Sequence, residues 1–586
     1  MDTNEKIKLL RQLMKENNIE ALYIPTDDYH LSEYVGNYFK QREFLTGFTG
    51  SAGSVILTEK DIHLWTDGRY FLQAEQQIKG TEIILERMGE KGVLTPLQFI
   101  CENKIRNLGI NFKVIPASFG KLLAKTINEN GGKLFDVDFI SQIWKDRPSL
   151  SHSLGYEMSL KYVGEKRSAK IKKIQDFISL KKQDLVILSS LDDIMYIYNL
   201  RGSDVDYNPV LLSYSVILKD KSILYIQNNT LSKRVINNLK KDNVIIKEYS
   251  EIYNDLNEYK NLKIIFDESK NNYALFNSLK NNEITNIDNS EFIKKQIKNK
   301  VEIKNIKLAH IKDGVAMCKF IYWLKHDKGF KDELMVSDKL LQFRKEQEGF
   351  LYPSFDTICG YAAHGAIVHY SADEKSNIQV KNEGILLVDS GGQYLQGTTD
   401  ITRSIVMGKV TNKMKRDFTL VLKGHLKLMS AVFKDGTRGS SLDILARGSL
   451  WDEFKDFNHG TGHGVGYFLN VHEGPNSIHY NRVNNTEMRE GMLTSNEPGI
   501  YIANEYGIRH ENLILCVKAK ENSYGTFLKF KTVTLVPFDL SGINVRLLTK
   551  EEKKVLNQYH AEVYKKISPY LSKKEKAWLK LVTKSI

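Results

Sequence analysis

The chain has 586 residues, which is too long for one hydrophobic core, so two to four domains are expected. Its 41% hydrophobic and 26% charged residues are typical of a globular protein, and no apolar run is long enough to predict a membrane span. The formal charge of +13 raises the question of a nucleic-acid partner. The lysines, however, are dispersed over helix-like segments without a nucleic-acid motif, so we expect neither a nucleic-acid nor a membrane partner.

The cysteines and the N-terminus indicate a compartment. Cys101, Cys318, Cys359 and Cys516 are scattered and lack the spacing of a metal site or a disulfide framework. The first twenty residues are charged and patterned like an amphipathic helix, with no secretory signal. A cytoplasmic protein is therefore expected.

Two α/β segments are predicted in the front half of the chain. In the first, "EALYIPT" predicts a strand, "SVILTEKDIHLWTDGRYF" a hairpin and "RYFLQAEQQI" a helix. After a break near Pro148, a helix around 163–180 and the strands "DLVILSS", "SYSVIL", "SILYI" and "KIIFDES" are predicted. We expect domains at 1–147, 148–304 and 305–586, the last holding every candidate catalytic residue and a C-terminal tail.

Two aspartates flank a glycine pair in "LLVDSGGQYLQGTTDITR". The apolar run predicts a buried strand ending at Asp389, and Gly391 and Gly392 allow a tight reversal that could bring Asp400 back towards it. A single aspartate at a strand end is more often a turn or cap residue. A buried carboxylate needs hydrogen bonds or a cation, so the pair suggests a cation site that requires further ligands.

Three histidines follow in "HGTGHGVGYFLNVHEGP". His459 and His463 have the spacing of a helical zinc motif, but the intervening glycines argue against a helix and no glutamate follows the first histidine. In extended chain the even spacing places both imidazoles on one face, and His472 falls on a later turn. Three histidines so close together in glycine-rich chain favour a functional role.

Two more carboxylates complete the set. Glu497 precedes Pro498 in "TSNEPGIY", which favours extended chain at that position. The segment "YGIRHENLILCV" predicts a strand with Arg509 and Glu511 on one face, and the alternative for this pair is a surface ion pair.

Four carboxylates and one imidazole suit Mn²⁺, Co²⁺ or Zn²⁺ rather than a structural zinc. Four negative charges balance two dications, and two such metals can share a bridging water, lower its pKa and polarise a carbonyl. The candidate ligands are Asp389, Asp400, His463, Glu497 and Glu511.

These motifs resemble the metallopeptidases of the pita-bread fold, which include methionine aminopeptidase, prolidase and aminopeptidase P. The resemblance is closest to the long, three-domain aminopeptidase P (Xaa-Pro aminopeptidase) family and covers nearly the whole chain. It implies an α/β (α+β) fold class, with two creatinase-like α/β domains before a pita-bread catalytic domain. The motifs that carry it are "FTGSAGS", "LWTDGRYFLQA", "YNLRGSDVDYNPV", "GAIVHY", "VDSGGQYLQGTTDITR", "HGTGHGVG", "NVHEGP", "NEPGIY" and "GIRHENL".

The resemblance also implies how the metals would be held. Asp389 would bind one metal, Asp400 and Glu511 would bridge both, and His463 and Glu497 would complete the other. Manganese is the metal that the family suggests, although zinc and cobalt also suit these ligands.

Further residues receive roles by the same resemblance. His369 would line the substrate site near the scissile bond, and His459 and His472 would contact the substrate and stabilise the tetrahedral intermediate. Arg509 would orient the bridging ligand, and Tyr501 matches a site tyrosine less closely. Glu497 would shuttle the proton, so the implied catalytic residues are Glu497, His369 and His472. His364 has no counterpart, and a core or surface role is expected for it.

The implied activity is hydrolysis of the bond between an N-terminal residue and a penultimate proline by a hydroxide bridging two metals. The substrates would be peptides with proline in the second position, and the family suggests a homodimer. Prolidase, which cleaves Xaa-Pro dipeptides, uses the same ligand types, but the three-domain length and "NLRGSDV" favour aminopeptidase P. Metal-free creatinase and non-catalytic binding proteins of this fold lack ligands that are all present here.

Overall fold

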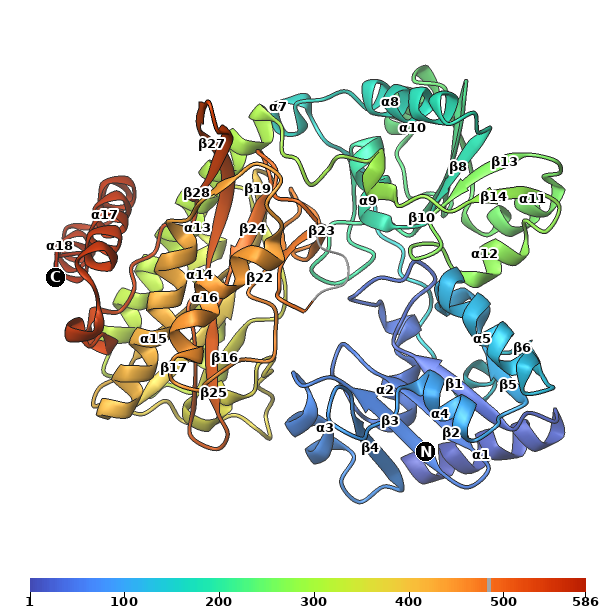
Figure 1. Ribbon diagram of the computed structural model, residues 1–586, viewed down its shortest axis with the longest axis horizontal. Coiled ribbons are helices and arrows are strands. Elements are labelled where there is room, and N and C mark those ends of the chain that lie inside the picture. Colours follow the sequence, from blue (N-terminus) through green and yellow to red (C-terminus); the bar gives the residue numbers. More distant parts are fainter. Residues whose placement is uncertain (482–485) are drawn as a thin grey trace. The chain divides into compact units, whose positions relative to one another are not determined.

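The computed structural model describes residues 1–481 and 486–586 (Figure 1). The chain divides into two compact units, Met1–Leu160 with Glu165–Lys294, and Lys161–Gly164 with Lys295–Ile586. Within the described residues, no helix combines the length and the apolar character needed to cross a bilayer.

The first unit contains two six-stranded sheets. In the first sheet the strand order is β4-β3-β2-β1-β5-β6, with antiparallel pairs between β3 and β2 and between β2 and β1, and parallel pairs elsewhere. The expected strand, hairpin and helix are confirmed as β1, β2–β3 and α3. The strands are β1 (Ala21–Pro25), β2 (Ser54–Thr58), β3 (Ile62–Thr66), β4 (Ile83–Arg87), β5 (Asn107–Ile110) and β6 (Lys133–Asp136). The helices are α1 (Thr3–Glu16), α2 (Gln41–Thr46), α3 (Phe71–Gln77), α4 (Pro96–Glu102), α5 (Ala117–Glu129) and α6 (Ile140–Ile143).

The second sheet repeats this plan. Its order is β12-β11-β10-β8-β13-β14, and each successive pair has the same direction as its counterpart in the first sheet. The matching order and directions support a duplication of one α/β unit. The strands are β8 (Leu185–Leu188), β10 (Ser213–Leu218), β11 (Ser222–Ile226), β12 (Val244–Glu248), β13 (Lys263–Phe266) and β14 (Glu283–Thr285), with a separate pair β7 (Tyr156–Glu157) and β9 (Leu200–Arg201). The helices are α8 (Arg167–Leu180), α9 (Leu191–Tyr198), α10 (Lys233–Lys241), α11 (Ile252–Glu258) and α12 (Tyr273–Asn277).

The second unit contains the segments with the candidate ligands. Its helix α13 begins at Lys300, where Asn299 and Glu302 form a capping box. Its largest sheet has the order β21-β28-β27-β24-β22-β23. Smaller sheets have the orders β15-β18-β19, β16-β17-β20 and β25-β26.

The helices of this unit, α13 to α18 along the chain, are preceded by the short α7, most of which also belongs to it. They are α7 (Leu160–Val163), α13 (Lys300–His326), α14 (Glu333–Lys345), α15 (Asn412–Met429), α16 (Gly439–Trp451), α17 (Lys550–Ile567) and α18 (Lys573–Val582). The strands are β15 (Phe350–Pro353), β16 (Ile358–Tyr361), β17 (Ile385–Ser390), β18 (Gly392–Tyr394), β19 (Gly397–Thr398), β20 (Ile401–Val406) and β21 (Val432–Lys434). They continue with β22 (Gly462–Gly464), β23 (Glu473–Ile478), β24 (Leu493–Asn496), β25 (Gly499–Ile502), β26 (Tyr506–Arg509), β27 (Asn512–Asn522) and β28 (Gly525–Thr532).

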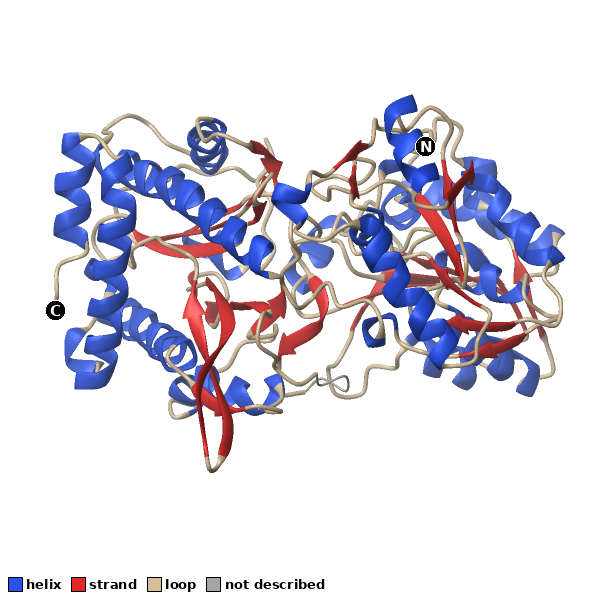
Figure 2. Ribbon diagram, turned by 90° about the horizontal axis from the view of Figure 1, so that it is seen from above, coloured by secondary structure: helices blue, strands red, loops and turns tan. Residues whose placement is uncertain are grey.

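A large hydrophobic core joins the helices and strands of this unit. Leu386 and Val388 of β17 belong to the same buried cluster as Phe320 of α13, Val421 of α15 and Val563 of α17. Figure 2 shows the helices flanking the strands of this unit. The apolar run before Asp389 is therefore a buried strand, as its composition predicts.

The tight reversal expected at Gly391 and Gly392 is wrong. Strands β17 and β20 do pair antiparallel, with Asp389 opposite Thr402, but β18 and β19 lie between them in the chain and form a separate hairpin next to β15. A Cβ atom on Gly391 would lie 2.0 Å from the Thr399 carbonyl oxygen. This glycine is needed for close packing of two backbones.

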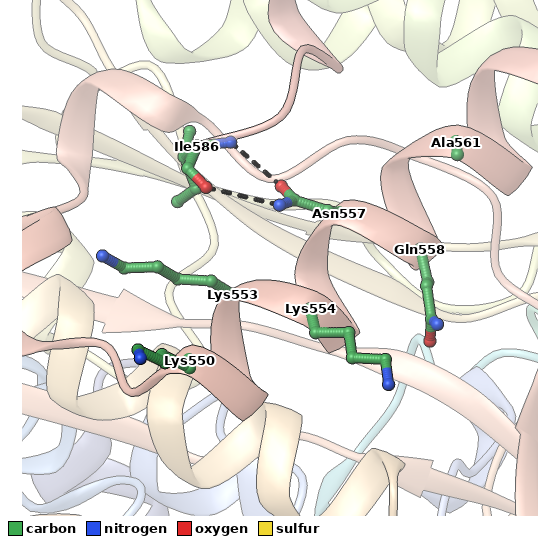
Figure 3. Close-up of a pocket in the computed structure, with 7 residues that line it drawn as sticks. All are labelled: Lys550, Lys553, Lys554, Asn557, Gln558, Ala561 and Ile586. Atoms are coloured by element: carbon green, nitrogen blue, oxygen red, sulfur yellow. Dashed lines mark hydrogen bonds between the residues drawn. The ribbon is translucent and has the colours of Figure 1, made fainter.

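The C-terminal segment is helical and anchored. Trp578 and Leu579 of α18 are buried in the core of the unit. Asn557 of α17 accepts a hydrogen bond from the Ile586 N–H at 3.1 Å and donates one to its carbonyl oxygen at 3.3 Å (Figure 3). An open surface pocket of about 520 Å³ lies beside this contact, lined by Lys550, Lys553, Lys554, Asn557, Gln558, Ala561 and Ile586.

Two glycines give a test of the packing between α15 and α16. A Cβ on Gly424 would lie 2.0 Å from the Ala446 carbonyl oxygen, whereas a Cβ on Gly448 meets nothing within 4 Å. We expect Gly424→Ala to destabilise the unit by about 1–3 kcal/mol through overpacking. Gly448→Ala should stabilise it by roughly 0.5–1 kcal/mol, because alanine favours a helix. Thermal unfolding midpoints of both variants check this, and shifts in the same direction would contradict it.

Candidate metal centre

Adjacent antiparallel strands bring the two predicted aspartates to one region. Asp389 lies in β17, and Asp400 comes directly before β20. Both side chains are buried. The strand pairing of Asp389 with Thr402 explains why residues eleven positions apart in the chain can serve one site.

Glycines allow His463 to enter the site. Cβ atoms on Gly462 and Gly464 would lie 2.0 Å and 2.1 Å from the carbonyl oxygens of Ser495 and Glu473, so β22 can approach its neighbours only with glycine at these positions. The Nδ1 atom of His463 lies 2.9 Å from the Gly464 carbonyl oxygen. This contact favours a proton on Nδ1 and leaves Nε2 for the site.

The remaining carboxylates approach from two further strands. Glu497 directly follows β24, and its Oε1 accepts a hydrogen bond from Ser495 Oγ at 3.0 Å. Glu511 precedes β27, and its Oε2 accepts a hydrogen bond from Thr402 Oγ1 at 2.8 Å.

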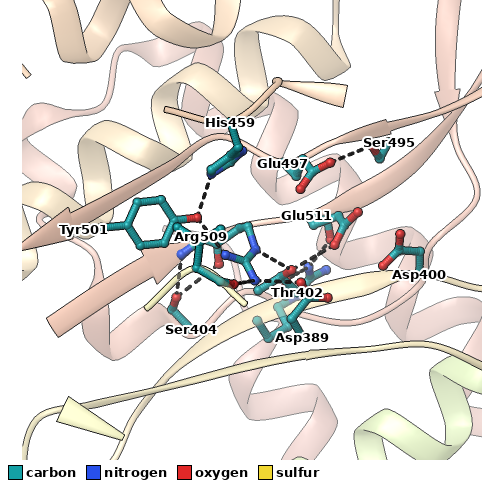
Figure 4. Close-up of polar contacts among 12 residues, drawn as sticks. Asp389, Asp400, Thr402, Ser404, His459, Ser495, Glu497, Tyr501, Arg509 and Glu511 are labelled. Atoms are coloured by element: carbon teal, nitrogen blue, oxygen red, sulfur yellow. Dashed lines mark hydrogen bonds and ion pairs between the residues drawn. The ribbon is translucent and has the colours of Figure 1, made fainter. Parts of the chain in front are cut away.

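Ligand atoms of three predicted residues form a compact group. One atom each from Asp400, His463 and Glu511 lies within 4.8 Å of the other two. His463 Nε2 is 3.5 Å from Asp400 Oδ2 and 3.3 Å from Glu497 Oε1. Asp389 lies in the same region, and Figure 4 shows the four carboxylates Asp389, Asp400, Glu497 and Glu511 together.

The electrostatics of this group are dominated by burial and like charge. Burial, followed by the charges of Asp400, Glu497 and Asp389, raises the pKa of Glu511 well above its usual value. Burial likewise raises the pKa values of Asp389 and Glu497, against the opposing charges of Arg509 and His463. The acidic groups therefore resist being ionised together unless a cation joins them.

His463 responds in the opposite direction. Burial alone would lower its pKa, but the hydrogen bond with Asp400 and the charges of Glu497 and Asp400 outweigh this and raise it to about 9. A positive charge is thus strongly favoured at the position where the acidic side chains meet.

These residues fit a pair of dications. Asp389 Oδ1 and Glu511 Oε1 are buried and accept no hydrogen bond from the part of the chain that the structure describes. Such acceptors are costly unless a ligand satisfies them. Four carboxylates with one imidazole suit Mn²⁺, Co²⁺ or Zn²⁺, and their formal charge matches two dications.

A hydrogen-bonded chain runs from this centre to His459. Arg509 Nη2 lies 2.6 Å from Asp389 Oδ2, and its Nη1 donates to Tyr501 OH at 2.7 Å. The same hydroxyl lies 2.7 Å from His459 Nε2 (Figure 4). Tyr501, which matched the family less closely by sequence, is therefore a central member of this network.

The prediction of one continuous strand through Arg509 and Glu511 is wrong. Strand β26 ends at Arg509 and β27 begins at Asn512, and the Arg509 side chain is paired with Asp389. The Glu511 N–H donates to the Thr402 carbonyl oxygen at 3.1 Å, so the chain changes partner at this point. The alternative of a surface ion pair fails because Arg509 and Glu511 are both buried.

The other predicted histidines lie in three different settings. The His472 ring is 4.2 Å from the His463 ring, centroid to centroid, in an edge-to-face arrangement. His369 lies between Val368, whose carbonyl oxygen accepts from Arg509 Nη2 at 3.3 Å, and Tyr370. His364 Nδ1 is 2.9 Å from Glu333 Oε1.

Several supporting residues are not apparent from the sequence. Thr402 and Ser495 hold two of the carboxylates, yet hydroxyls in strands are common and give no signal. Glu473, next to His472, forms a buried ion pair with Lys298 at 2.5 Å. Of this pair, Glu473 could have been found from the sequence, because it stands in the motif "NVHEGP". Lys298 could not, because it is one of many lysines.

Family comparisons cover almost the entire chain. Residues 304–518 match metallopeptidase family M24, and residues 526–586 match the C-terminal region of peptidase M24. Residues 6–143 and 146–302 each match a creatinase/prolidase N-terminal domain. The expected fold class, two creatinase-like domains and a pita-bread domain, is confirmed.

Individual relatives are similar over their full length. A probable Xaa-Pro aminopeptidase P of Laccaria bicolor is 37% identical over 601 residues, covering 99% of this chain and 93% of the relative. Xaa-Pro aminopeptidase 1 of Dictyostelium discoideum is 36% identical over 604 residues, covering 98% and 96%.

Solved structures separate two of the alternatives. The X-prolyl aminopeptidase of Caenorhabditis elegans, described as a cytosolic enzyme with a di-nuclear active site, has a TM-score of 0.95 at 31% identity and covers 100% of both chains. The prolidase of Pyrococcus horikoshii has a TM-score of 0.50 at 25% identity, and the match covers 64% of this chain and 99% of that one. From its full-length relatives and its catalytic-domain match, the chain belongs to the Xaa-Pro aminopeptidase P family of M24 metallopeptidases.

Proposed function

We propose that this chain is an aminopeptidase that releases the N-terminal residue from peptides with proline in the second position. The observation that carries the proposal is the grouping of three carboxylates, Asp400, Glu497 and Glu511, around His463, with buried oxygens on Glu511 and on the neighbouring Asp389 that lack partners among the described residues. The names of the full-length relatives support the Xaa-Pro preference.

The metal assignment follows the family resemblance, and the grouping of the ligand atoms supports it. Asp389 would bind one metal, Asp400 and Glu511 would bridge both, and His463 and Glu497 would complete the second, with Mn²⁺ preferred and Zn²⁺ or Co²⁺ also suited. Two dications held in this way would supply a hydroxide from a bridging water and polarise the scissile carbonyl.

The protein side chains would manage the protons and the substrate. Hydrolysis breaks the C–N bond, adds the water oxygen to the carbonyl carbon and transfers a proton to the proline nitrogen. Glu497 is suited to move this proton, because its carboxylate lies beside His463 in the candidate centre and the hydrogen bond from Ser495 fixes its Oε1. His369, His459 and His472 would contact the substrate, and the Arg509–Tyr501–His459 chain would hold His459 in register with Asp389.

A penultimate proline explains why such a site is needed. The Xaa–Pro bond has no N–H, so a peptidase that recognises this group by a hydrogen bond loses that contact. A site that recognises the proline ring by its shape does not depend on that hydrogen bond.

We further propose three domains at 1–147, 148–304 and 305–586, a cytoplasmic location and a homodimer. All four cysteines lie in the described part of the chain and are free, as a reducing compartment favours. The C. elegans relative is described as cytosolic.

Substrate preference gives the first test. Purified, metal-loaded protein should cleave Arg-Pro-Pro at least about a hundredfold faster than Arg-Ala-Ala, on the scale of discrimination that a shaped site can supply. Chromatography of the products measures both rates. Equal turnover would exclude the proline preference, and activity confined to dipeptides would indicate a prolidase.

Metal removal gives the second test. Dialysis against a chelator should abolish activity and lower the thermal unfolding midpoint, because the buried carboxylates then repel one another. Elemental analysis of the active protein should find about two metals per chain, as the charge balance requires. Retained activity in metal-free protein would contradict the assignment, and restoration by Mn²⁺, Zn²⁺ or Co²⁺ would rank the metals.

Tyr501 gives the third test. Tyr501→Phe removes the hydroxyl that joins Arg509 to His459, and we expect kcat/KM to fall roughly tenfold to a hundredfold with the metal content unchanged. Tyr506→Phe is a matched control, because this buried hydroxyl in the same hairpin donates to Asp417 at 2.7 Å. Equal activity losses in the two variants would show that the effect is not specific to the network.

A further inference from the structure

Glu333 is a fully buried carboxylate at the start of α14. The preceding Asp332 caps the helix by accepting from the Met335 N–H, so Glu333 is not needed for that purpose. Its carboxylate instead faces a separate segment of the chain, residues 361–378, which contains His369.

Four groups of this segment hydrogen-bond to Glu333. Its Oε1 accepts from the Tyr361 N–H at 2.8 Å and lies 2.9 Å from His364 Nδ1. Its Oε2 accepts from Tyr370 OH at 2.8 Å and from the Ile378 N–H at 3.3 Å. The Glu333 side chain thus hydrogen-bonds to the beginning, the middle and the end of the segment.

The segment is packed as well as hydrogen-bonded. The His364 and Tyr370 rings lie 4.4 Å apart, centroid to centroid, and both contact Glu333. Burying a carboxylate is costly unless donors surround it, and here the loop supplies them. The loop and the carboxylate are therefore mutually dependent, and this gives His364, which has no counterpart in the family pattern, a structural partner.

His369 is held between two anchored neighbours. On one side, the Val368 carbonyl oxygen accepts from Arg509, which is paired with Asp389 of the candidate metal centre. On the other side, the Tyr370 hydroxyl is bound by Glu333. The backbone at His369 is thus connected both to the candidate metal centre and to α14.

We propose that Glu333 is a positioning residue, which through Tyr370 and His364 fixes the loop that presents His369 to the substrate. The inference rests on the proposed function, in which His369 contacts the peptide. Glu333 itself touches no reacting atom, so its effect must pass through His369.

Tyr370→Phe is the primary test, because it removes one hydroxyl and leaves the other three contacts of Glu333 in place. We expect kcat/KM for Arg-Pro-Pro to fall roughly tenfold to a hundredfold, as misplacement of a substrate-contacting group does. Tyr361→Phe is the matched control: its hydroxyl donates to the Glu383 carbonyl oxygen at 2.8 Å, while its N–H bond to Glu333 remains. The kcat/KM of this control should stay within about twofold of the wild-type value, because its hydroxyl makes no contact with Glu333.

A double-mutant cycle with His369→Ala separates positioning from general loosening of the structure. If Tyr370 acts through His369, adding Tyr370→Phe to His369→Ala should lower kcat/KM no further. Glu333→Gln, if it folds, should behave in the same way. Additive losses, an unaffected Tyr370→Phe, or an equal loss in Tyr361→Phe would each overturn the inference. Wild-type protein that fails to cleave Arg-Pro-Pro would instead refute the proposed function.

Discussion

Repulsion among buried carboxylates is the constraint around which the catalytic unit is arranged. Asp389, Asp400, Glu497 and Glu511 come from four separate points of the chain, and burial with like charge raises the pKa of Glu511 well above its usual value. Such a cluster is unfavourable unless positive charge is supplied. The same acids raise the pKa of His463 to about 9, because they favour a positive charge on its ring.

The fold meets this demand by fixing each acid through a neighbour. Thr402 holds Glu511, Ser495 holds Glu497, and Arg509 holds Asp389. These partners lie on β20, β24 and β26, which belong to three different sheets, so each acid is fixed by a residue that is itself held in a sheet. Arg509 extends the same rigidity to Tyr501 and to the backbone beside His369.

The resemblance names all five candidate ligands, and two of them also stand beside residues with a strong backbone preference. Pro498 favours extended chain at Glu497, and the glycines beside His463 argue against a helix, where the structure has β22. What failed depended on distant partners. The hairpin β18–β19 pairs with β15, so the glycine pair did not close a tight turn, and the break between Arg509 and Glu511 reflects hydrogen bonding to β20. Glu333 gave no signal, because its partners lie 28 to 45 positions further along the chain.

The order of the strands along the polypeptide has a consequence for biosynthesis. The two repeated sheets precede every candidate ligand, whereas Glu511 comes last and leads directly into β27, which lies inside the six-stranded sheet between β24 and β28. Domains generally fold from the N-terminus as the chain emerges. The front half can therefore fold before any candidate ligand has been synthesised, and the candidate centre is complete only after Glu511 and the sheet around β27 have formed.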